Sequence, residues 1–307
     1  MVLVVALSIV APTFLSAQNL LNVGVQSAVV AVLALGSTFV IVSGGIDLSV
    51  GSVAALSAMV GAWSSAEAGL PGPIALPLGL VTGVVAGLVN GALVSYGRLP
   101  AFIATLAMLS VARGLTLVVS QGTPLTTPDV ISFLGSNLGQ YLPVPLLIML
   151  VFFGLTALVL TRTYSGRAMY AIGGNPEAAR LCGIDVRRQQ LVIYALSGLF
   201  AAVAGMMLAG RLSSAGPQAA VGYELDAIAA VVIGGASLSG GVGSASGTVI
   251  GALVLAVLRN GLNQLQVSPF WQQVVIGVVI ALAVLADTLR RGNPRRHPHR
   301  RSGRNNR

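Results

Sequence analysis

Long apolar runs, separated by short polar or glycine-rich stretches, dominate the hydrophobic pattern of the chain. A helix needs about 20 apolar residues to cross roughly 30 Å of hydrocarbon, so runs of about this length predict membrane-spanning helices. Ten such runs lie at residues 2–17, 24–43, 48–65, 74–95, 100–120, 143–161, 190–210, 226–238, 246–265 and 271–289. The run 226–238 is short for a full crossing, and we expect a re-entrant or tilted helix there. The run 2–17 is also short, but no basic segment precedes it, which favours a first span over a signal peptide.

The composition supports a membrane protein rather than a soluble one. Hydrophobic residues make up 55% of the 307 residues and charged residues only 8%, whereas soluble domains contain about 25% charged residues. These proportions exclude a soluble enzyme and an intrinsically disordered chain. The predicted fold class is an all-α, polytopic integral membrane protein of about ten helices. We expect one transmembrane domain over 1–289 and an Arg-rich tail over 290–307.

The basic residues are concentrated on one predicted side of the membrane. The net charge is +9, and every basic residue except the two histidines is an arginine, with eight arginines in the tail 290–307. Because cytoplasmic loops carry an excess of arginine, this distribution places the loop 162–189 and both termini in the cytoplasm. The charge excess therefore indicates a tail that contacts anionic lipid rather than a surface that binds nucleic acid.

Several chemistries are excluded by the residues that the chain lacks. Cys182 is the single cysteine, and the two histidines, His297 and His299, both lie in the tail. We therefore expect no metal site, no cofactor and no histidine-based catalysis within the spans. The chain contains no lysine, so the lysine-containing phosphate-binding loop of ATPases is absent. If ATP drives this protein, a partner must hydrolyse it.

The loop 162–189 contains the signals of a short helix. Asn175 is a good N-cap, Pro176 suits the first turn, Glu177 complements the positive helix end, and Gly183 can close the helix in the left-handed conformation. A helix of two turns is marginal by itself. It is therefore expected either to dock into a groove of another protein or to lie on the membrane surface.

Four sequence blocks resemble the ABC importer permeases of the ribose/xylose/galactose type. Glu177-Ala178-Ala179-x-x-x-Gly183 is similar to the loop that seats in the ATP-binding subunit of these importers. The other three blocks are residues 43–52 (SGGIDLSVGS), 97–106 (GRLPAFIATL) and 229–251, which contains GGASLSGG. The resemblance implies that the chain is not an enzyme but the membrane subunit of an ATP-driven importer for a monosaccharide such as ribose. A nucleoside or other small-solute permease, and an ion-coupled carrier or channel, are the alternatives.

The same resemblance implies a set of partners and a location. It implies a separate ABC ATPase subunit, an extracytoplasmic sugar-binding protein and a second permease copy, all at the bacterial cytoplasmic membrane. The residues expected to couple to the ATPase are Asn175, Pro176, Glu177, Ala178, Ala179, Arg180 and Gly183.

Two glycine-rich stretches repeat one pattern, GGIDLS at 44–49 and GGASLS at 234–239. In each stretch the glycines can end one helix, and Asp47 or Ser237 can cap the next. Irregular backbone at membrane depth requires a protein or aqueous environment, and transporters often build substrate sites at such breaks. Asp47 and Ser237 are thus either caps or contacts for sugar hydroxyls.

Other polar residues within the predicted spans are candidates for the substrate path. They are Gln26, Asn90, Asn260, Asn263 and Gln264, of which Asn260 and Gln264 share a helix face at a spacing of four. Each amide can contact solute or bond a neighbouring helix. We select Asp47, Asn90, Ser237, Asn260 and Gln264 as the candidate path.

Two arginines within the predicted spans need partners. An arginine at the centre of a membrane helix raises the free energy of insertion by about 2.5–3.5 kcal/mol. Arg113 and Arg259 therefore each need a carboxylate or carbonyl groups nearby. An Asp47–Arg113 pair is one possibility, and pairing with carbonyl groups or extension towards the membrane surface is another.

Overall fold

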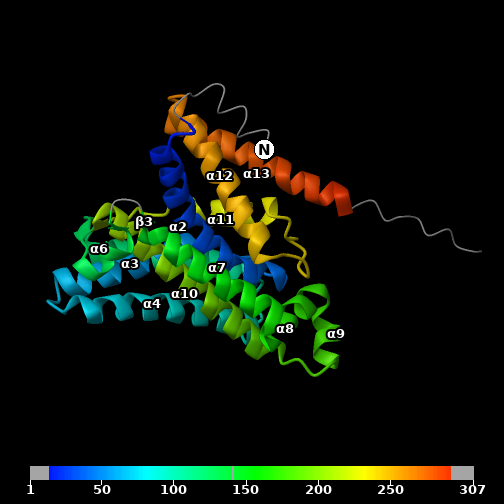
Figure 1. Ribbon diagram of the computed structural model, residues 1–307. Coiled ribbons are helices and arrows are strands. Elements are labelled where there is room, and N and C mark those ends of the chain that lie inside the picture. Colours follow the sequence, from blue (N-terminus) through cyan, green and yellow to red (C-terminus); the bar gives the residue numbers. More distant parts are fainter. Residues whose placement is uncertain (1–13, 140–141, 292–307) are drawn as a thin grey trace, which may run out of the picture.

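The computed structural model describes residues 14–139 and 142–291, and helices form most of this part of the chain (Figure 1). The helices are α2 (Ala17–Val42), α3 (Val50–Ala66), α4 (Gly72–Ser95), α5 (Ala101–Ser120), α6 (Asp129–Leu134), α7 (Val144–Arg162), α8 (Tyr164–Gly174), α9 (Pro176–Leu181), α10 (Val186–Leu212), α11 (Tyr223–Ile233), α12 (Ala245–Gln264) and α13 (Pro269–Arg291). Four two-residue strands form two antiparallel pairs: β1 (Leu125–Thr126) with β4 (Ser214–Ala215), and β2 (Asn137–Leu138) with β3 (Leu142–Pro143).

Helix α2 forms the centre of the bundle. It is apolar on all sides, which is typical of a helix surrounded by others, and every residue from 27 to 42 is buried. It packs against α7, α10, α11 and α12. Phe200 of α10 packs between α2 and α7. The centre of its ring lies 5.5 Å from that of Phe39 of α2 and 4.7 Å from that of Phe152 of α7, both in edge-on geometry.

Helices α3, α4 and α10 form a tightly packed layer, with α4 running alongside α10 (Figure 1). The sequence allows this because small residues line the contacts. A Cβ atom added to Gly87 of α4 would overlap the carbonyl oxygen of Tyr194 in α10. Gly83 and Gly198 face each other in the same way. Close approach of the backbones therefore depends on glycine at these positions.

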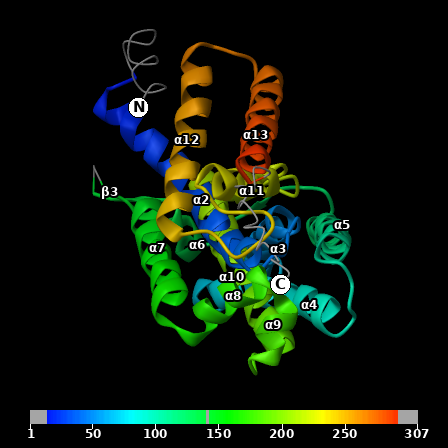
Figure 2. The same cartoon turned by 90° about the vertical axis from the view of Figure 1, so that its right-hand side faces the viewer.

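Helices α12 and α13 project from the remainder of the bundle, on the side where α2 begins (Figures 1 and 2). Large apolar side chains on the outer helices are exposed, including Leu150 of α7 and Val118 of α5, the latter at 73%. In a bilayer these side chains contact lipid, so their exposure carries no penalty.

The structure supports an all-α membrane protein, but it does not confirm a count of about ten spans. Six helices in the described residues are long and apolar enough to cross a membrane, namely α2, α4, α5, α7, α10 and α12. The apolar parts of α3 and α13 are shorter. Helix α11, which lies in the run 226–238, has 11 residues and spans only about 16 Å at 1.5 Å per residue. Most of the run 2–17 and of the tail 290–307 lies outside the described residues.

Candidate functional site

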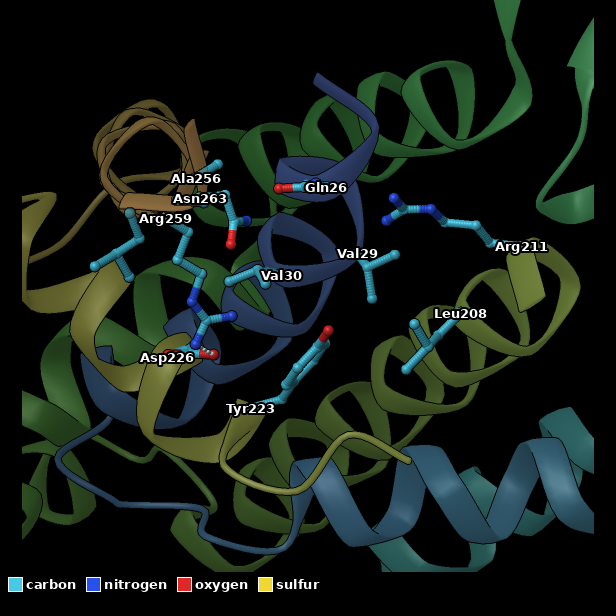
Figure 3. Close-up of a pocket in the computed structure, with 12 residues that line it drawn as sticks. Gln26, Val29, Val30, Leu208, Arg211, Tyr223, Asp226, Ala256, Arg259 and Asn263 are labelled. Atoms are coloured by element: carbon cyan, nitrogen blue, oxygen red, sulfur yellow. Dashed lines mark hydrogen bonds and ion pairs between the residues drawn. The ribbon is translucent and has the colours of Figure 1, made fainter. Parts of the chain in front are cut away.

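A cavity of about 230 Å³ lies between α2, α10, α11 and α12 (Figure 3). Its apolar wall comes from Val29, Val30, Leu208, Ala252, Leu255 and Ala256. Its polar groups are Gln26, Arg211, Tyr223, Asp226, Arg259 and Asn263. Ligand pockets for drug-sized molecules measure about 300–1,000 Å³, so this cavity suits a smaller solute.

An ion pair forms one wall of the cavity. Asp226 lies in the first turn of α11 with its side chain 4% exposed, and its Oδ2 accepts a 2.6 Å hydrogen bond from Nη2 of Arg259 in α12. The Arg259 guanidinium also lies 5.9 Å from the centre of the Tyr223 ring. A carboxylate placed against a guanidinium and an aromatic face lowers the cost of holding this arginine at membrane depth.

Arg211 and Gln26 complete the polar part of the cavity. Arg211 lies in the last turn of α10, and its guanidinium extends towards the cavity from the side opposite Arg259 (Figure 3). Gln26 reaches the cavity from α2, and Asn263 lies one turn beyond Arg259 on α12. Amide, guanidinium, phenol and carboxylate groups together offer both donors and acceptors. Such a set can bind a small solute that carries several hydroxyl groups.

The segment around α9 lies beyond the other end of α10. Helix α10 has 27 residues and is therefore about 40 Å long. Asn175 caps α9, because its Oδ1 accepts hydrogen bonds of 3.0 Å from the backbone N–H groups of Glu177 and Ala178. Gly183 follows with a φ of +83°. The predicted N-cap, first-turn proline and closing glycine are thus confirmed.

Helix α9 presents an exposed surface. Glu177 and Arg180 form an ion pair of 3.0 Å with side chains 74% and 59% exposed. Ala179 is buried against Ile172 and Val186 and holds α9 to α8 and α10. Leu181 is 90% exposed, and Cys182, the C-cap residue, is an exposed free thiol. One face of α9 is thus anchored and the other is open.

The two glycine-rich stretches form the same local turn. Oδ1 of Asp47 accepts hydrogen bonds from the backbone N–H (2.9 Å) and Oγ (2.6 Å) of Ser49. Oγ of Ser237 accepts from the backbone N–H of Ser239 at 3.1 Å and lies 2.6 Å from its Oγ. The prediction that Asp47 and Ser237 cap the following helices is wrong, because the N-cap of α3 is Ser49 and that of α12 is Ser244. Helix α3 begins directly after the first turn, whereas a further loop precedes α12.

Asp47 and Asn90 belong to a buried network and do not line the cavity. Oδ2 of Asp47 accepts a 2.8 Å hydrogen bond from Oγ of Ser197, and Nδ2 of Asn90 donates to Oγ of Ser49 at 2.9 Å. Asp47 and Asn90 are 3% and 1% exposed. The network connects α4 and α10 to the start of α3.

Arg113 pairs with carbonyl groups. Its Nη1 donates hydrogen bonds of 2.9 Å to the carbonyl oxygens of Pro217 and Ala219. Both oxygens of Asp47 are occupied by serines, so the possible Asp47–Arg113 pair does not form. The expectation that each membrane arginine has a carboxylate or carbonyl partner is confirmed. Asp226, at the start of the predicted run 226–238, is buried beside Arg259.

Comparison with known proteins identifies the family. Residues 19–284 match the family described as "Branched-chain amino acid transport system / permease component". The chain belongs to this permease family. The resemblance seen in the four sequence blocks is confirmed by relatives named for ribose and xylose transport.

Three relatives illustrate the similarity of the permease to characterised chains. Ribose import permease protein RbsC of Bacillus subtilis (strain 168) is 49% identical over 295 residues, which cover 93% of this permease and 89% of the relative. RbsC of Haemophilus influenzae is 43% identical over 291 residues, covering 93% and 90%. Xylose transport system permease protein XylH of Escherichia coli (strain K12) is 36% identical over 337 residues, covering 90% and 86%. The permease is a multi-pass membrane protein of this kind.

One of the predicted path residues, Asn260, joins two helices in the permease, and Gln264 bonds to it. Asn19 of α2 and Asn260 of α12 form a reciprocal amide pair, with Nδ2–Oδ1 distances of 3.0 and 2.8 Å. Nε2 of Gln264 donates to Oδ1 of Asn260 at 3.4 Å. The sequence pointed to this face of α12, whereas Asn263 and Arg259, on the neighbouring face, line the cavity. The spacing of polar residues within one run cannot reveal which face of α12 borders the cavity, because the rotation of α12 about its axis depends on its packing against α2 and α11.

Within the described ranges, no group of three or more histidine, cysteine or acidic residues is placed to hold a metal ion. The groups available to a solute in the permease are therefore hydrogen-bonding side chains and the Tyr223 ring.

Proposed function

We propose that the chain is the membrane-spanning subunit of an ATP-driven importer that moves a monosaccharide such as ribose across a bacterial cytoplasmic membrane. The family description names branched-chain amino acids. Relatives at 43–49% identity over about nine-tenths of their length are instead named for ribose import, and this similarity favours a sugar.

The cavity between α2, α10, α11 and α12 is the proposed solute site, and its lining is the observation that carries the proposal. Gln26 and Asn263 offer amides, and Tyr223 offers a ring against which the C–H face of a sugar can lie. Asp226 and Arg259 are occupied largely with each other, so the amides of Gln26 and Asn263, the Tyr223 hydroxyl and the Arg211 guanidinium remain to bond a solute with several hydroxyl groups. A loosely bonded solute leaves readily, as transport requires.

ATP hydrolysis is assigned to a separate ABC ATPase subunit that docks on α9. The exposed Leu181 supplies an apolar contact, and the flanking charges of Glu177 and Arg180 supply specificity. Together with Asn175, Pro176, Ala178, Ala179 and Gly183, these residues form the coupling surface within the loop 162–189. This surface lies in the cytoplasm together with both termini and the tail 290–307, while residues 1–289 form the permease domain.

Two further partners complete the proposed importer. An extracytoplasmic sugar-binding protein delivers solute at the opposite face, where Arg211 lies in the last turn of α10. A second permease subunit, identical or related, forms the other half of the translocation unit. Asp47, Asn90 and Ser237 lie outside the cavity. In this proposal they stabilise the two glycine-rich stretches, 44–49 and 234–239, and the helices beside them.

Uptake by proteoliposomes tests the function. The permease, reconstituted with its ATPase and binding protein, is expected to accumulate radiolabelled ribose only with ATP on the ATPase side. Galactose, adenosine and leucine are measured in parallel, since greater uptake of adenosine or leucine would replace the sugar assignment. Uphill uptake by the permease alone on an ion gradient would contradict an ATP-driven importer.

A pair of matched variants tests the cavity. Gln26→Leu combined with Asn263→Leu is expected to raise the KM for ribose about tenfold, as expected when about 1.4 kcal/mol of binding is lost. Gln18→Leu, at an exposed position of the same helix α2, is the control and should leave the KM unchanged. An unchanged KM in the double variant would remove this cavity from the solute path.

A further inference from the structure

Three backbone segments meet without intervening side chains near α9. They are the end of α2, the end of α8 and the loop before α12. The backbone N–H of Gly241 donates a 2.8 Å hydrogen bond to the carbonyl oxygen of Val42. A Cβ atom on Gly173 would overlap that same oxygen, and a Cβ on Gly240 would lie 2.9 Å from Cα of Gly44. We call Gly44, Gly173, Gly240 and Gly241 the glycine junction.

Glycine is required in the junction for two reasons. Gly44, Gly240 and Gly241 have φ angles of +82°, +85° and +74°, which side-chain-bearing residues rarely adopt. Gly173 has no such angle, and only the closeness of its neighbours excludes a side chain. Contacts between backbones contain no rotatable side chain that could absorb a displacement, so a movement of one segment is passed to the others.

The junction lies between α9 and the two glycine-rich stretches. Gly173 and Gly174 end α8, and the next residue, Asn175, is the N-cap of α9. Gly44 opens the stretch that leads to α3, and Gly240 and Gly241 lead to α12, which carries Arg259 and Asn263 into the cavity. A second link runs in parallel, because Oη of Tyr170 in α8 donates a 2.8 Å hydrogen bond to the carbonyl oxygen of Gly243.

We infer that the glycine junction transmits the displacement of α9 to the glycine-rich stretches that lead to α3 and to α12. Gly173 and Tyr170 are then positioning residues for transport. This inference rests on the proposed importer function. Helix α8 acts as the arm between the docking surface and the junction. When the ATPase moves α9, Gly173 presses on the end of α2 and on the loop before α12, and the far end of α12 changes the cavity.

The test uses the complex of permease, ATPase and binding protein in proteoliposomes. Gly173→Ala is expected to lower the amount of ribose transported per ATP hydrolysed by about tenfold, because the added methyl group separates the three segments. Gly174→Ala is the matched control: this neighbouring glycine is exposed, and a Cβ on it would meet nothing within 4 Å. Its transport ratio should equal that of the wild type.

A second control separates coupling from simple structural damage. Gly83→Ala disturbs another close backbone contact, between α4 and α10, away from the junction. It should reduce the yield of assembled complex but leave the ribose-to-ATP ratio unchanged. Equal ratios for Gly173→Ala and Gly174→Ala would overturn the inference. If Gly173→Ala fails to assemble, Tyr170→Phe decides: it keeps the ring, and a wild-type ratio in this variant would overturn the inference.

Hydrogen exchange gives a readout that does not depend on the solute. In the wild type and in Gly174→Ala, adding ATP to the assembled complex should change the exchange of residues 245–264. In Gly173→Ala this change should be lost, and its persistence would contradict the role of the junction. A wild type that moves no ribose but shows the exchange change would contradict the sugar assignment alone.

Discussion

The guanidinium of Arg259 donates a hydrogen bond of 2.6 Å to the carboxylate of Asp226, and this pair separates two cavities. The proposed solute cavity of about 230 Å³ lies on one side, and a cavity of about 370 Å³ against α13 lies on the other. Both residues line both cavities. A change in this pair alters the wall between two polar spaces at the end of the molecule opposite α9.

Breaking the pair should destabilise the protein. In Arg259→Gln the Asp226 carboxylate stays buried without its counter-ion, which we expect to cost about 2–5 kcal/mol. The thermal midpoint of the purified protein in detergent measures this loss. The double variant Arg259→Gln with Asp226→Asn should recover part of the stability, because a neutral amide pair leaves no buried charge. Additive losses in the double variant would contradict a direct interaction.

Ser197 tests whether Asp47 is structural. Ser197→Ala removes the donor to Oδ2 of Asp47 and should lower the free energy of unfolding by about 1–3 kcal/mol. The KM for ribose should not change, because neither residue lines the cavity. Ser110→Ala, on the exposed face of α5, is the control. A raised KM with unchanged stability would instead indicate that Asp47 contacts the solute.

The cap of α9 should matter for assembly. Asn175→Ala removes two hydrogen bonds from the start of the helix and should cost about 1 kcal/mol of helix stability. The affinity of the ATPase subunit, measured by titration, should fall accordingly. Ser16→Ala removes the N-cap of α2, at the other end of the molecule, and should leave that affinity unchanged.

Charge reversal on α9 separates docking from folding. Glu177→Arg combined with Arg180→Glu keeps an ion pair on α9 but inverts its polarity. Because both side chains are exposed, the thermal midpoint should fall only slightly, by the loss of the favourable placement of Glu177 at the positive end of α9. ATPase affinity should fall at least about tenfold, since charges on the partner would then meet like charges. Full transport activity in this variant would exclude these two residues from the coupling surface.

The amides Asn260 and Gln264 are expected to affect stability as well as uptake. Asn260→Leu with Gln264→Leu leaves Asn19 without its reciprocal partner and should cost about 1–2 kcal/mol. Ribose uptake should fall with the α2–α12 contact, while the ATPase subunit still co-purifies. Normal uptake at normal stability would show that neither amide serves the path.

Local features were predictable from the sequence because their causes are local. Asn175, Pro176 and Gly183 are neighbours in the chain, and caps and closing glycines act over one turn of helix. The repeated glycine-rich pattern likewise produces the same turn twice, at Asp47 and at Ser237.

The lining of the cavity was not predictable in the same way. Successive residues of a helix differ by about 100° in direction, so Asn260 and Asn263, three residues apart, point only about 60° from each other, and both were candidates for the path. Only the packing of α12 against α2 and α11 decides which residues of α12 line the cavity. The pairing of Arg259 with Asp226 depends on the same packing, since 33 residues separate them.

Cys182 has a practical consequence for every experiment on subunit docking. It is the single cysteine of the chain, and its free thiol is exposed at the C-terminal end of α9. A maleimide fluorophore would therefore attach at one defined position of the unaltered protein. Its emission would report in real time on the arrival and departure of the ATPase, without a cysteine-free background.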